Sequence, residues 1–455
     1  MNAPTLSQHI QAPIAQELVD YIIDFLHDDP HSLRQCSRVC RSWLPASSLH
    51  LLRTINIILC THEPLFVSFA LVLSNRCRCE KSPNWDTVHL TRTRRILGNS
   101  PRLQMNIRNL SILSRYTWGT CVTRPEWGSE NPICLFDLLP SLRNLTISTT
   151  LLYSIHPPPA HLHAPREIDT LTLISTSFVE VLHLQACIGF LKCFRHISHL
   201  ELCIQSDTSV YSTSEVPTDV EVLHQPLISR LEFTHHCIPN NIAYSLRWLR
   251  RTIDLTSLST LIMNDYFPID QSLAVDLPRF LLETTNLRSL TLNQYVFSTA
   301  AHSIPPSLRE LKVNCLHDDW PDVFNDIAHV KIPLAEKITL HLSVFKRYSE
   351  ALRYVRDVSN FEFPNYEGQI RAVLQSPDYS SLDPFVGRVN HVAIHVSMKR
   401  LHESAMGNWA ELDFDVDRLI QSVREMVSQQ LSPSARDAVQ SIVTYDERPD
   451  LRKSR

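Results

Sequence analysis

The chain has 455 residues, of which 44% are apolar and 20% are charged, and its formal net charge is −4. This length exceeds a single typical core and predicts several domains or a repeat array. The composition is that of a soluble globular protein and excludes a wholly disordered one. Without a global basic field, nucleic acid is excluded as the expected main partner.

Targeting and redox features point to a reduced compartment. The first residues, MNAPTLSQHIQAPI, have neither the basic nor the apolar region of a secretory signal. The most apolar run, Leu65 to Leu73, spans nine residues and is too short to cross a bilayer. Twelve cysteines without a secretion signal are expected to stay reduced. We therefore expect a cytoplasmic or nuclear protein with no membrane partner.

Glycines are few and isolated, which bears on catalytic motifs. The chain has seven glycines against 28 prolines, and no two glycines lie within four residues of each other. Phosphate-binding loops and nucleophile elbows need closely spaced glycines. The sequence therefore contains no GxGxxG, P-loop or GxSxG motif.

The first predicted helix follows residues 1–12, which are predicted to be disordered, and runs through about Leu26. At about 100° per residue, its apolar side chains cover an arc of roughly 200°. A surface helix that serves one core needs a stripe of only about 100°. The excess predicts two apolar partners, namely the rest of the helix's own domain and something outside it. The side chains on this arc are Leu18, Val19, Tyr21, Ile22, Ile23, Phe25 and Leu26.

A second helix is predicted from the next segment. Asp29 fits its N-cap and Pro30 its first position, where no backbone N–H is needed. An apolar stripe then runs to Leu44, and Pro45 is expected to end the helix because its ring excludes a further turn. A third short helix at about Leu49 to Leu52 would close a compact unit. An ordinary three-helix cap without an outside partner is the alternative interpretation.

Three short motifs within residues 13–52 match a known pattern. The chain contains IAQELVDYII, then DDP, then CSRVCRSW, in that order. This stretch resembles the F-box, specifically the F-box-like domains expanded in fungi, which have LPxELVDYII, a DDP turn and CSxVCRSW. Ala15 stands where the family usually has proline.

The resemblance implies a specific role. An F-box docks on the small adaptor of cullin–RING ubiquitin ligases, and the rest of the chain selects the protein that is ubiquitylated. The departure at Ala15 implies a weaker adaptor contact. The chain itself is then expected to be non-catalytic and to need no cofactor. The adaptor-binding residues that the resemblance implies are Ile14, Glu17, Leu18, Tyr21, Ile22, Leu33, Val39 and Trp43.

Residues 53–343 carry a repeated pattern, apolar-x-x-apolar-x-apolar. Its middle residues, at positions 110, 145, 171, 200, 231, 261, 290, 311 and 338, are separated by 21 to 35 residues. Segments with apolar residues at 3–4 spacing fill the gaps and are predicted to be helices. These segments are Pro132 to Leu139, Phe178 to Ile197, Asn241 to Ile253, Ser272 to Glu283 and Pro321 to Ala328.

One short strand and one helix in every 20–30 residues or so resembles an irregular leucine-rich-repeat domain. The predicted fold class is therefore α/β, with an N-terminal three-helix F-box followed by a solenoid that has an inner parallel sheet and outer helices. The asparagine of the repeat consensus occurs only sporadically, at Asn293 and Asn314. A doubly wound sheet built from ordinary βα units is the alternative fold.

The repeat weakens over residues 344–443, which are predicted to be degenerate terminal repeats and a helical cap. Tyr348 to Val358 and Gln369 to Leu374 have helical patterns, and a strand at Val389 stands alone. Further helices are predicted at Arg418 to Leu431 and, after a break, at Pro433 to Val443. The charged residues 444–455 are predicted to form a disordered tail.

Three groups of side chains invite a metal or catalytic interpretation, and none completes a motif. The cysteine group lacks the paired CxxC of structural zinc sites. The aspartate group lacks the glycine and the closing glutamate of a calcium loop. The histidine group has no carboxylate or cysteine at motif spacing. We therefore predict no metal site and no enzyme constellation. The groups are Cys77 and Cys79 with nearby Cys60 and His62; Asp413, Asp415 and Asp417; and His341, His391 and His395.

Polar residues of the predicted strands indicate where a protein client would bind. Residues that flank each middle apolar residue face the open, concave side of a solenoid. The inserted loop Asp207 to Asp219 is the competing site. A repeat scaffold without productive ligase assembly is the alternative function, and an enzyme within the repeat body is a third. The expected client-binding residues are His199, Glu201, Arg230, Glu232, Glu310, Lys312 and Lys337.

Overall fold

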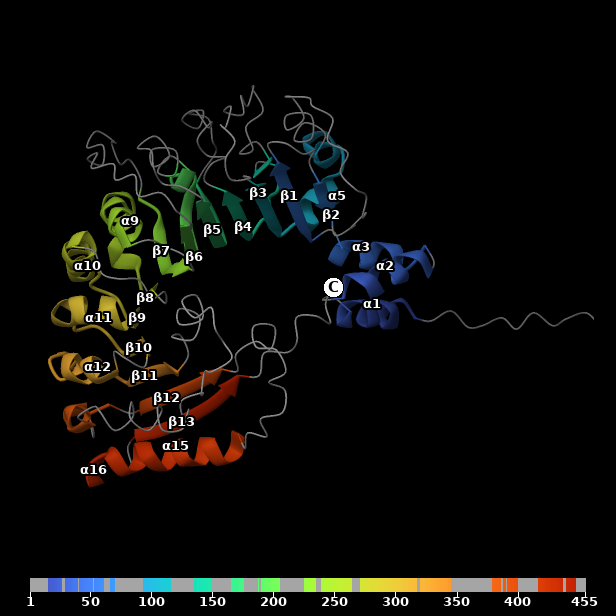
Figure 1. The fold of residues 1–455 in the computed structure, drawn as a ribbon. Helices are drawn as coiled ribbons and strands as arrows, with labels where there is room; N and C mark the ends of the chain where they lie inside the picture. The colour runs from blue at the N-terminus through green and yellow to red at the C-terminus, as the bar shows by residue number, and fades with distance from the viewer. Residues whose placement is uncertain are drawn as a thin grey trace, which may run out of the picture. The chain divides into compact units, whose positions relative to one another are not determined.

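The structure is a computed structural model of the chain, drawn in Figure 1. It describes residues 15–26, 29–39, 41–51, 53–60, 66–69, 93–115, 135–136, 138–148, 165–175, 187, 190–204, 225–234, 239–263, 271–316, 320–344, 379–385, 388–389, 391–399, 416–436 and 439–446. The chain divides into two compact units. Unit 1 comprises Met1–Ala160 and Ile168–Thr172, and unit 2 comprises His161–Glu167 and Leu173–Arg455.

Unit 1 begins with three short helices, α1 (Gln16–Phe25), α2 (Pro30–Val39) and α3 (Leu44–Leu51). Asp29 caps α2, as predicted, because its Oδ1 accepts a hydrogen bond from the backbone N–H of Ser32 at 3.1 Å. The hydroxyl and backbone N–H of Ser32 hold the pKa of this carboxyl below its ordinary value.

The boundary between α2 and α3 differs from the prediction. Helix α2 ends at Val39, and Pro45 lies in the first turn of α3 instead of ending α2. Proline is tolerated in a first turn, where its missing N–H leaves no intrahelical bond unmade. Pro45 is therefore an initiator of the third helix, which starts earlier than Leu49.

The strands form one mostly parallel sheet. In the described residues, thirteen strands lie in the order β2-β1-β3-β4-β5-β6-β7-β8-β9-β10-β11-β12-β13, and only β2 is antiparallel to its neighbour. From β3 onward the spatial order follows the chain order. A doubly wound sheet reverses its order part-way, so this alternative is wrong and the predicted solenoid-like α/β class is confirmed. The strands are β1 (Thr54–Cys60), β2 (Phe66–Phe69), β3 (Asn109–Arg115), β4 (Asn144–Ser148), β5 (Arg166–Ser175), β6 (Phe194–Ile204), β7 (Leu227–Thr234), β8 (Thr260–Met263), β9 (Ser289–Asn293), β10 (Glu310–Leu316), β11 (Lys337–Val344), β12 (His391–Lys399) and β13 (Val439–Asp446).

Helices in the sequence gaps of unit 2 cover one side of its strands. Figure 1 shows α9 to α12 along one side of β7 to β11. Three predicted helices are confirmed at nearly the predicted bounds, as α9, α10 and α12. The bounds of the helices that follow α3 are α5 (Pro101–Asn106), α9 (Pro239–Thr252), α10 (Gln271–Glu283), α11 (Gln294–Ala300), α12 (Trp320–Ile327), α15 (Val416–Gln430) and α16 (Pro433–Arg436), with 3₁₀ turns η1 (Leu255–Ser257), η2 (Ala301–Ser303) and η5 (Tyr379–Phe385).

The core is built from the repeated apolar positions. In unit 2 the middle leucines pair in register from strand to strand, Leu200 with Leu231, then Leu261 and Leu290. The third apolar residue of each repeat follows two positions later on the same face, as period-two alternation requires. The six middle leucines predicted to be buried all have 0–1% of their surface exposed. They are Leu145, Leu171, Leu200, Leu231, Leu261 and Leu290.

Consecutive repeats are joined where each strand begins. The carbonyl of Arg288 accepts hydrogen bonds from the backbone N–H groups of both Arg309 and Glu310, each at 2.8 Å. The carbonyl of Arg309 accepts from Glu336 and Lys337 in the same way. One carbonyl thus satisfies two donors of the next repeat, which fixes the register of the open-face residues described below.

Three predictions about element type or strand pairing are wrong. The predicted helix ending at Ile197 is replaced from Phe194 onward by β6. The strand near Val389 does not stand alone, because β12 pairs with β11 and β13. Pro433 to Val443 is helical only through Arg436, and β13 continues to Asp446, into the segment predicted as a tail. Residues 439–443 have an apolar pattern that fits a short helix or a strand, and pairing with β12 decides for the strand.

Several predicted features lie outside the described residues. They are Ile14, Cys77, Cys79, Asp413, Asp415, the loop Asp207 to Asp219 and the predicted helices at Tyr348 to Val358 and Gln369 to Leu374.

Candidate interaction faces on the helices and the sheet

Helix α1 has two apolar faces, one buried and one exposed. Val19 and Ile23 are buried and pack with Leu33 and Cys36 of α2. This spacing of four residues places both on one side of the helix. The three-helix unit therefore has its own small core, closed by the partly buried Leu26, Trp43, Ala46 and Leu51.

The other apolar face of α1 is exposed. Leu18, Tyr21, Ile22 and Phe25 have 58%, 72%, 42% and 80% of their surface exposed. They stand at positions i, i+3, i+4 and i+7, so they form one continuous stripe. We call these four residues the α1 stripe. Isolated exposed apolar side chains are ordinary, but a contiguous row of large ones is typical of a binding surface.

The remaining predicted adaptor residues divide between surface and core. Val39 is exposed near the end of α2, and Glu17 is exposed in the first turn of α1. Leu33 is buried in the helical core, so in this structure it can contribute to adaptor binding only by supporting the exposed residues from within. Trp43 is half-buried against the same core.

The sequence prediction omitted three exposed apolar residues from the set of contacts. Phe25 completes the α1 stripe, and Leu44 and Leu49 are exposed on α3. The spacing of seven residues from Leu18 was the available signal for Phe25. No comparable signal identifies the two leucines of α3, because that helix is apolar on more than one side.

Ala15 begins α1 without a side-chain cap. Its carbonyl accepts hydrogen bonds from the N–H groups of Leu18 and Val19 at 3.0 and 3.2 Å. Its φ of −57° and ψ of 137° lie within the range that proline adopts. The backbone at this position thus already has the conformation that the family's usual proline would impose.

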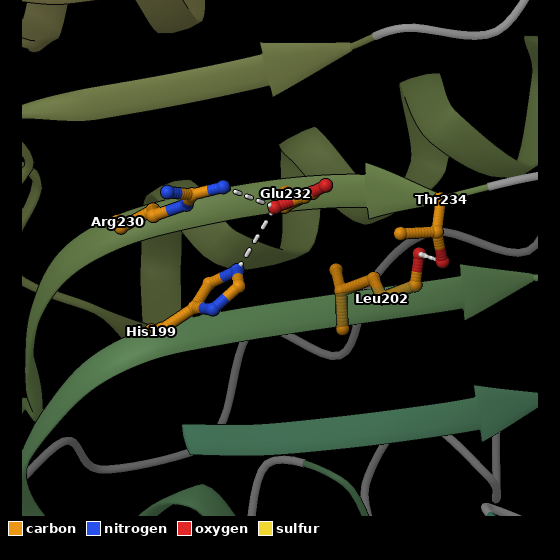
Figure 2. A network of polar contacts seen from close by, with 5 residues as sticks. All are labelled: His199, Leu202, Arg230, Glu232 and Thr234. Atoms are coloured by element: carbon orange, nitrogen blue, oxygen red, sulfur yellow. Dashed lines mark hydrogen bonds and ion pairs between the residues drawn. The ribbon is translucent and has the colours of Figure 1, made fainter. Parts of the chain in front are cut away.

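The second face is the side of the unit 2 sheet that points away from its buried leucines. On β6 and β7, His199 pairs in register with Arg230, and Glu201 pairs with Glu232. Figure 2 shows that Arg230 and His199 converge on one carboxylate. Arg230 Nη2 donates to Glu232 Oε2 at 2.7 Å, and His199 Nε2 lies 3.1 Å from the same oxygen. Three of the predicted client residues therefore form one polar network.

The other predicted client residues lie on β10 and β11, also in unit 2. Glu310 pairs in register with Lys337, and its Oε2 accepts a hydrogen bond from Ser289 Oγ at 3.3 Å. Lys312 is one strand step further along β10. Burial, together with the charge of Lys337, lowers the pKa of the Lys312 ammonium below its ordinary value.

Histidines on β11 and β12 extend this second group. His341 and His395 pair in register, and their rings stack with centroids 4.5 Å apart. His341 Nδ1 lies 3.0 Å from Asn314 Oδ1 of β10. Burial and the nearby charge of Lys312 hold the pKa of His395 below its ordinary value. Within the described ranges, no group of three or more histidine, cysteine or acidic side chains is arranged to hold a metal ion.

No family model matches the chain, and no curated protein is similar to it. None of the helices that the structure describes is long and apolar enough to cross a membrane.

Proposed function

We propose that this chain is the substrate-recognition subunit of a cullin–RING ubiquitin ligase. In this role the three helices bind the ligase adaptor, and through it the cullin, while the sheet of unit 2 binds a protein client. The chain supplies binding surfaces and positioning, and the transfer chemistry belongs to its partners.

The observation that carries the proposal is the α1 stripe. A helix of ten residues that packs one apolar face into its own core and exposes another has surface to bury against a partner. The stripe lies within the segment whose motifs resemble an F-box, where the family docks its adaptor. Full burial of one large apolar side chain contributes about 1.5–3 kcal/mol, so four such residues give enough apolar area for specific binding.

The compartment proposed for this function is the cytosol or the nucleus. Cys36 and Cys187, both buried, are free thiols. Free thiols are the usual state of cysteine in both of these compartments.

The direct test is reconstitution from purified components. The full chain is mixed with the purified adaptor, and binding is measured by calorimetry with and without the amino-terminal domain of a cullin. We expect a one-to-one complex with micromolar or tighter affinity. Failure of the folded wild-type chain to bind the adaptor at micromolar concentration would remove the main support for the ligase proposal.

A second arm of this test addresses Ala15. The backbone at Ala15 already fits proline. Ala15→Pro is therefore expected to stabilise the folded chain by about 0.4–1 kcal/mol, because proline lowers the conformational entropy of the unfolded chain. If wild type fails to bind and Ala15→Pro binds, the chain is a repeat scaffold that lost productive ligase assembly at this position. If both bind equally, the alanine has no effect on the adaptor contact.

A further inference from the structure

Strands β10, β11 and β12 present a regular grid of side chains on the face opposite to Leu311, Ile338 and Val392. Two members of this grid, Asn314 and Ala393, are themselves buried. The first row is Glu310, Lys337 and His391, the second is Lys312, Thr339 and Ala393, and the third is Asn314, His341 and His395. Neighbouring strands are about 4.8 Å apart, and alternate residues along a strand are about 6.6 Å apart. Five basic side chains thus originate within an area on the order of 10 by 13 Å. We call Lys312, Lys337, His341, His391 and His395 the basic cluster.

The basic cluster has little negative charge of its own. Glu310 is the one carboxylate in the grid, and it accepts a hydrogen bond from Ser289. In the part of the chain that the structure describes, neither Lys312 nor Lys337 forms an ion pair with a carboxylate. Other cations of unit 2 do have partners, for example Arg309 with Glu336 at 2.8 Å.

The charge of Lys312 opposes folding. Lys312 is half-buried and lies near another lysine, and both conditions disfavour its charged form. Folding alone would favour a neutral residue at such a position. Stability that is given up at a defined site is typical of a functional constraint.

The network on β6 and β7 provides the contrast. Arg230 and His199 both contact Glu232, so the cation there already has its anion. Glu201 stands beside Glu232 in register and adds further negative charge. The residues expected to contact a client therefore fall into two groups of different character, one internally neutralised and one with positive charge left over.

We propose that the basic cluster binds an acidic segment of the client, whose carboxylate or phosphate groups lie over β10 to β12. This inference rests on the proposed role of the sheet in client recognition. It assigns client recognition to three strands and to anionic groups of the client. The lysine ammonium groups donate hydrogen bonds to the anionic groups. His391 and His395 add ring N–H donors on β12.

A protein segment fits this surface better than nucleic acid does. The cluster covers only three strands, and the same face carries Glu201 and Glu232 on β6 and β7. A long polyphosphate backbone would meet these carboxylates, whereas a short acidic peptide would not. The chain as a whole also has a net charge of −4, which disfavours non-specific nucleic-acid binding.

The test uses the full chain and a fluorescein-labelled octaglutamate peptide, with binding measured by fluorescence anisotropy at low and physiological salt. A peptide that carries phosphoserines distinguishes phosphate from carboxylate recognition. Oligolysine and a short DNA duplex are the comparison probes. We expect the acidic peptides to bind, and to bind more weakly as salt increases.

The decisive variant is Lys312→Gln combined with Lys337→Gln. It is expected to weaken octaglutamate binding at least about tenfold. Arg309→Gln is the matched control, because Arg309 lies outside the expected client-binding residues and already pairs with Glu336 at 2.8 Å, and it is expected to change binding less than about twofold. Equal binding by wild type and the double variant overturns the proposal. Absence of acidic-peptide binding by wild type, or tighter binding of oligolysine or DNA, also overturns it.

A stability readout separates a binding role from a structural one. Lys312→Met removes the buried charge and its repulsion from Lys337, so its melting temperature is expected to equal or exceed that of wild type while peptide binding is lost. A lower melting temperature with unchanged peptide binding assigns Lys312 a structural role and contradicts the proposal. Adaptor binding is scored separately on the same proteins. If wild type does not bind the adaptor, that result counts against the ligase function only. The role of the basic cluster is decided by peptide binding only.

Discussion

The α1 stripe yields the sharpest prediction, because interface and core residues alternate on one short helix. Replacing Leu18 and Phe25 with serine should weaken adaptor binding while the protein stays folded. Leu18 and Phe25 have 58% and 80% of their surface exposed. Scaling about 1.5–3 kcal/mol for full burial by these fractions gives about 1–1.7 kcal/mol for Leu18 and about 1.2–2.4 kcal/mol for Phe25.

Together the two side chains could contribute about 2–4 kcal/mol, so the double variant should lose about 30- to 1,000-fold in affinity. The change in its unfolding free energy should stay within about 0.5 kcal/mol, because both positions are on the surface. Ile23→Ala is expected to do the opposite and to lower the unfolding free energy. Ile23 is fully buried, and its truncation should cost about 2–5 kcal/mol of stability.

Calorimetry with the purified adaptor measures the affinity, and urea unfolding measures the stability. Met105→Ser is the matched control, because Met105 lies on α5 of the same unit with 59% of its surface exposed. The reasoning is refuted if the double variant binds the adaptor as tightly as wild type. It is also refuted if Met105→Ser weakens binding to the same extent, because the effect would then not belong to the α1 stripe.

Three further predictions concern unit 2 and are measured by urea unfolding. Leu231→Ala should cost about 2–5 kcal/mol, because Leu231 is fully buried; a loss below that range would contradict its place in the core. Asn293→Ala should cost about 0.5–2 kcal/mol, because Asn293 Oδ1 accepts the Val296 N–H at 3.0 Å and caps α11; a variant as stable as wild type would exclude this cap. The pKa of His395 is held below its ordinary value by burial and by Lys312. As the pH falls, His395 therefore binds its proton in the unfolded state before it does so in the folded state. This lowers the contribution of His395 to stability as the pH drops below about 6.5. His395→Asn should lose less stability than wild type between about pH 7.5 and 5.5, and an equal loss in both proteins would contradict this account.

The repeat architecture was predictable from the sequence because its causes are local. A strand that buries one face needs apolar residues two positions apart, and the pair Leu231 and Phe233 has this spacing in β7. The cap at Asp29 was equally predictable, since a side chain that bonds its own next turn needs no distant partner.

The partition of apolar residues between core and surface was decided by the tertiary structure. Leu18 and Ile23 belong to the same helix and have similar hydrophobicity, yet one is exposed and the other buried. Sequence spacing identified a wide apolar arc but could not say which half faces α2 and α3. For the same reason the spacing did not show that Leu33 is buried, and Phe25 was omitted from the predicted contacts.

The sequence alone determined which residues alternate, that Asp29 caps a helix and that the strands repeat, because these features depend on neighbours a few positions away. Only the tertiary structure decided the pairing of segments outside the regular repeat and which polar side chains meet. Residues 439–446 became β13 through pairing with β12. His199 met Glu232, 33 residues away, through the register of β6 and β7. Register is set by hydrogen bonds and packing between segments far apart in the chain, and a single sequence carries no local signal of them.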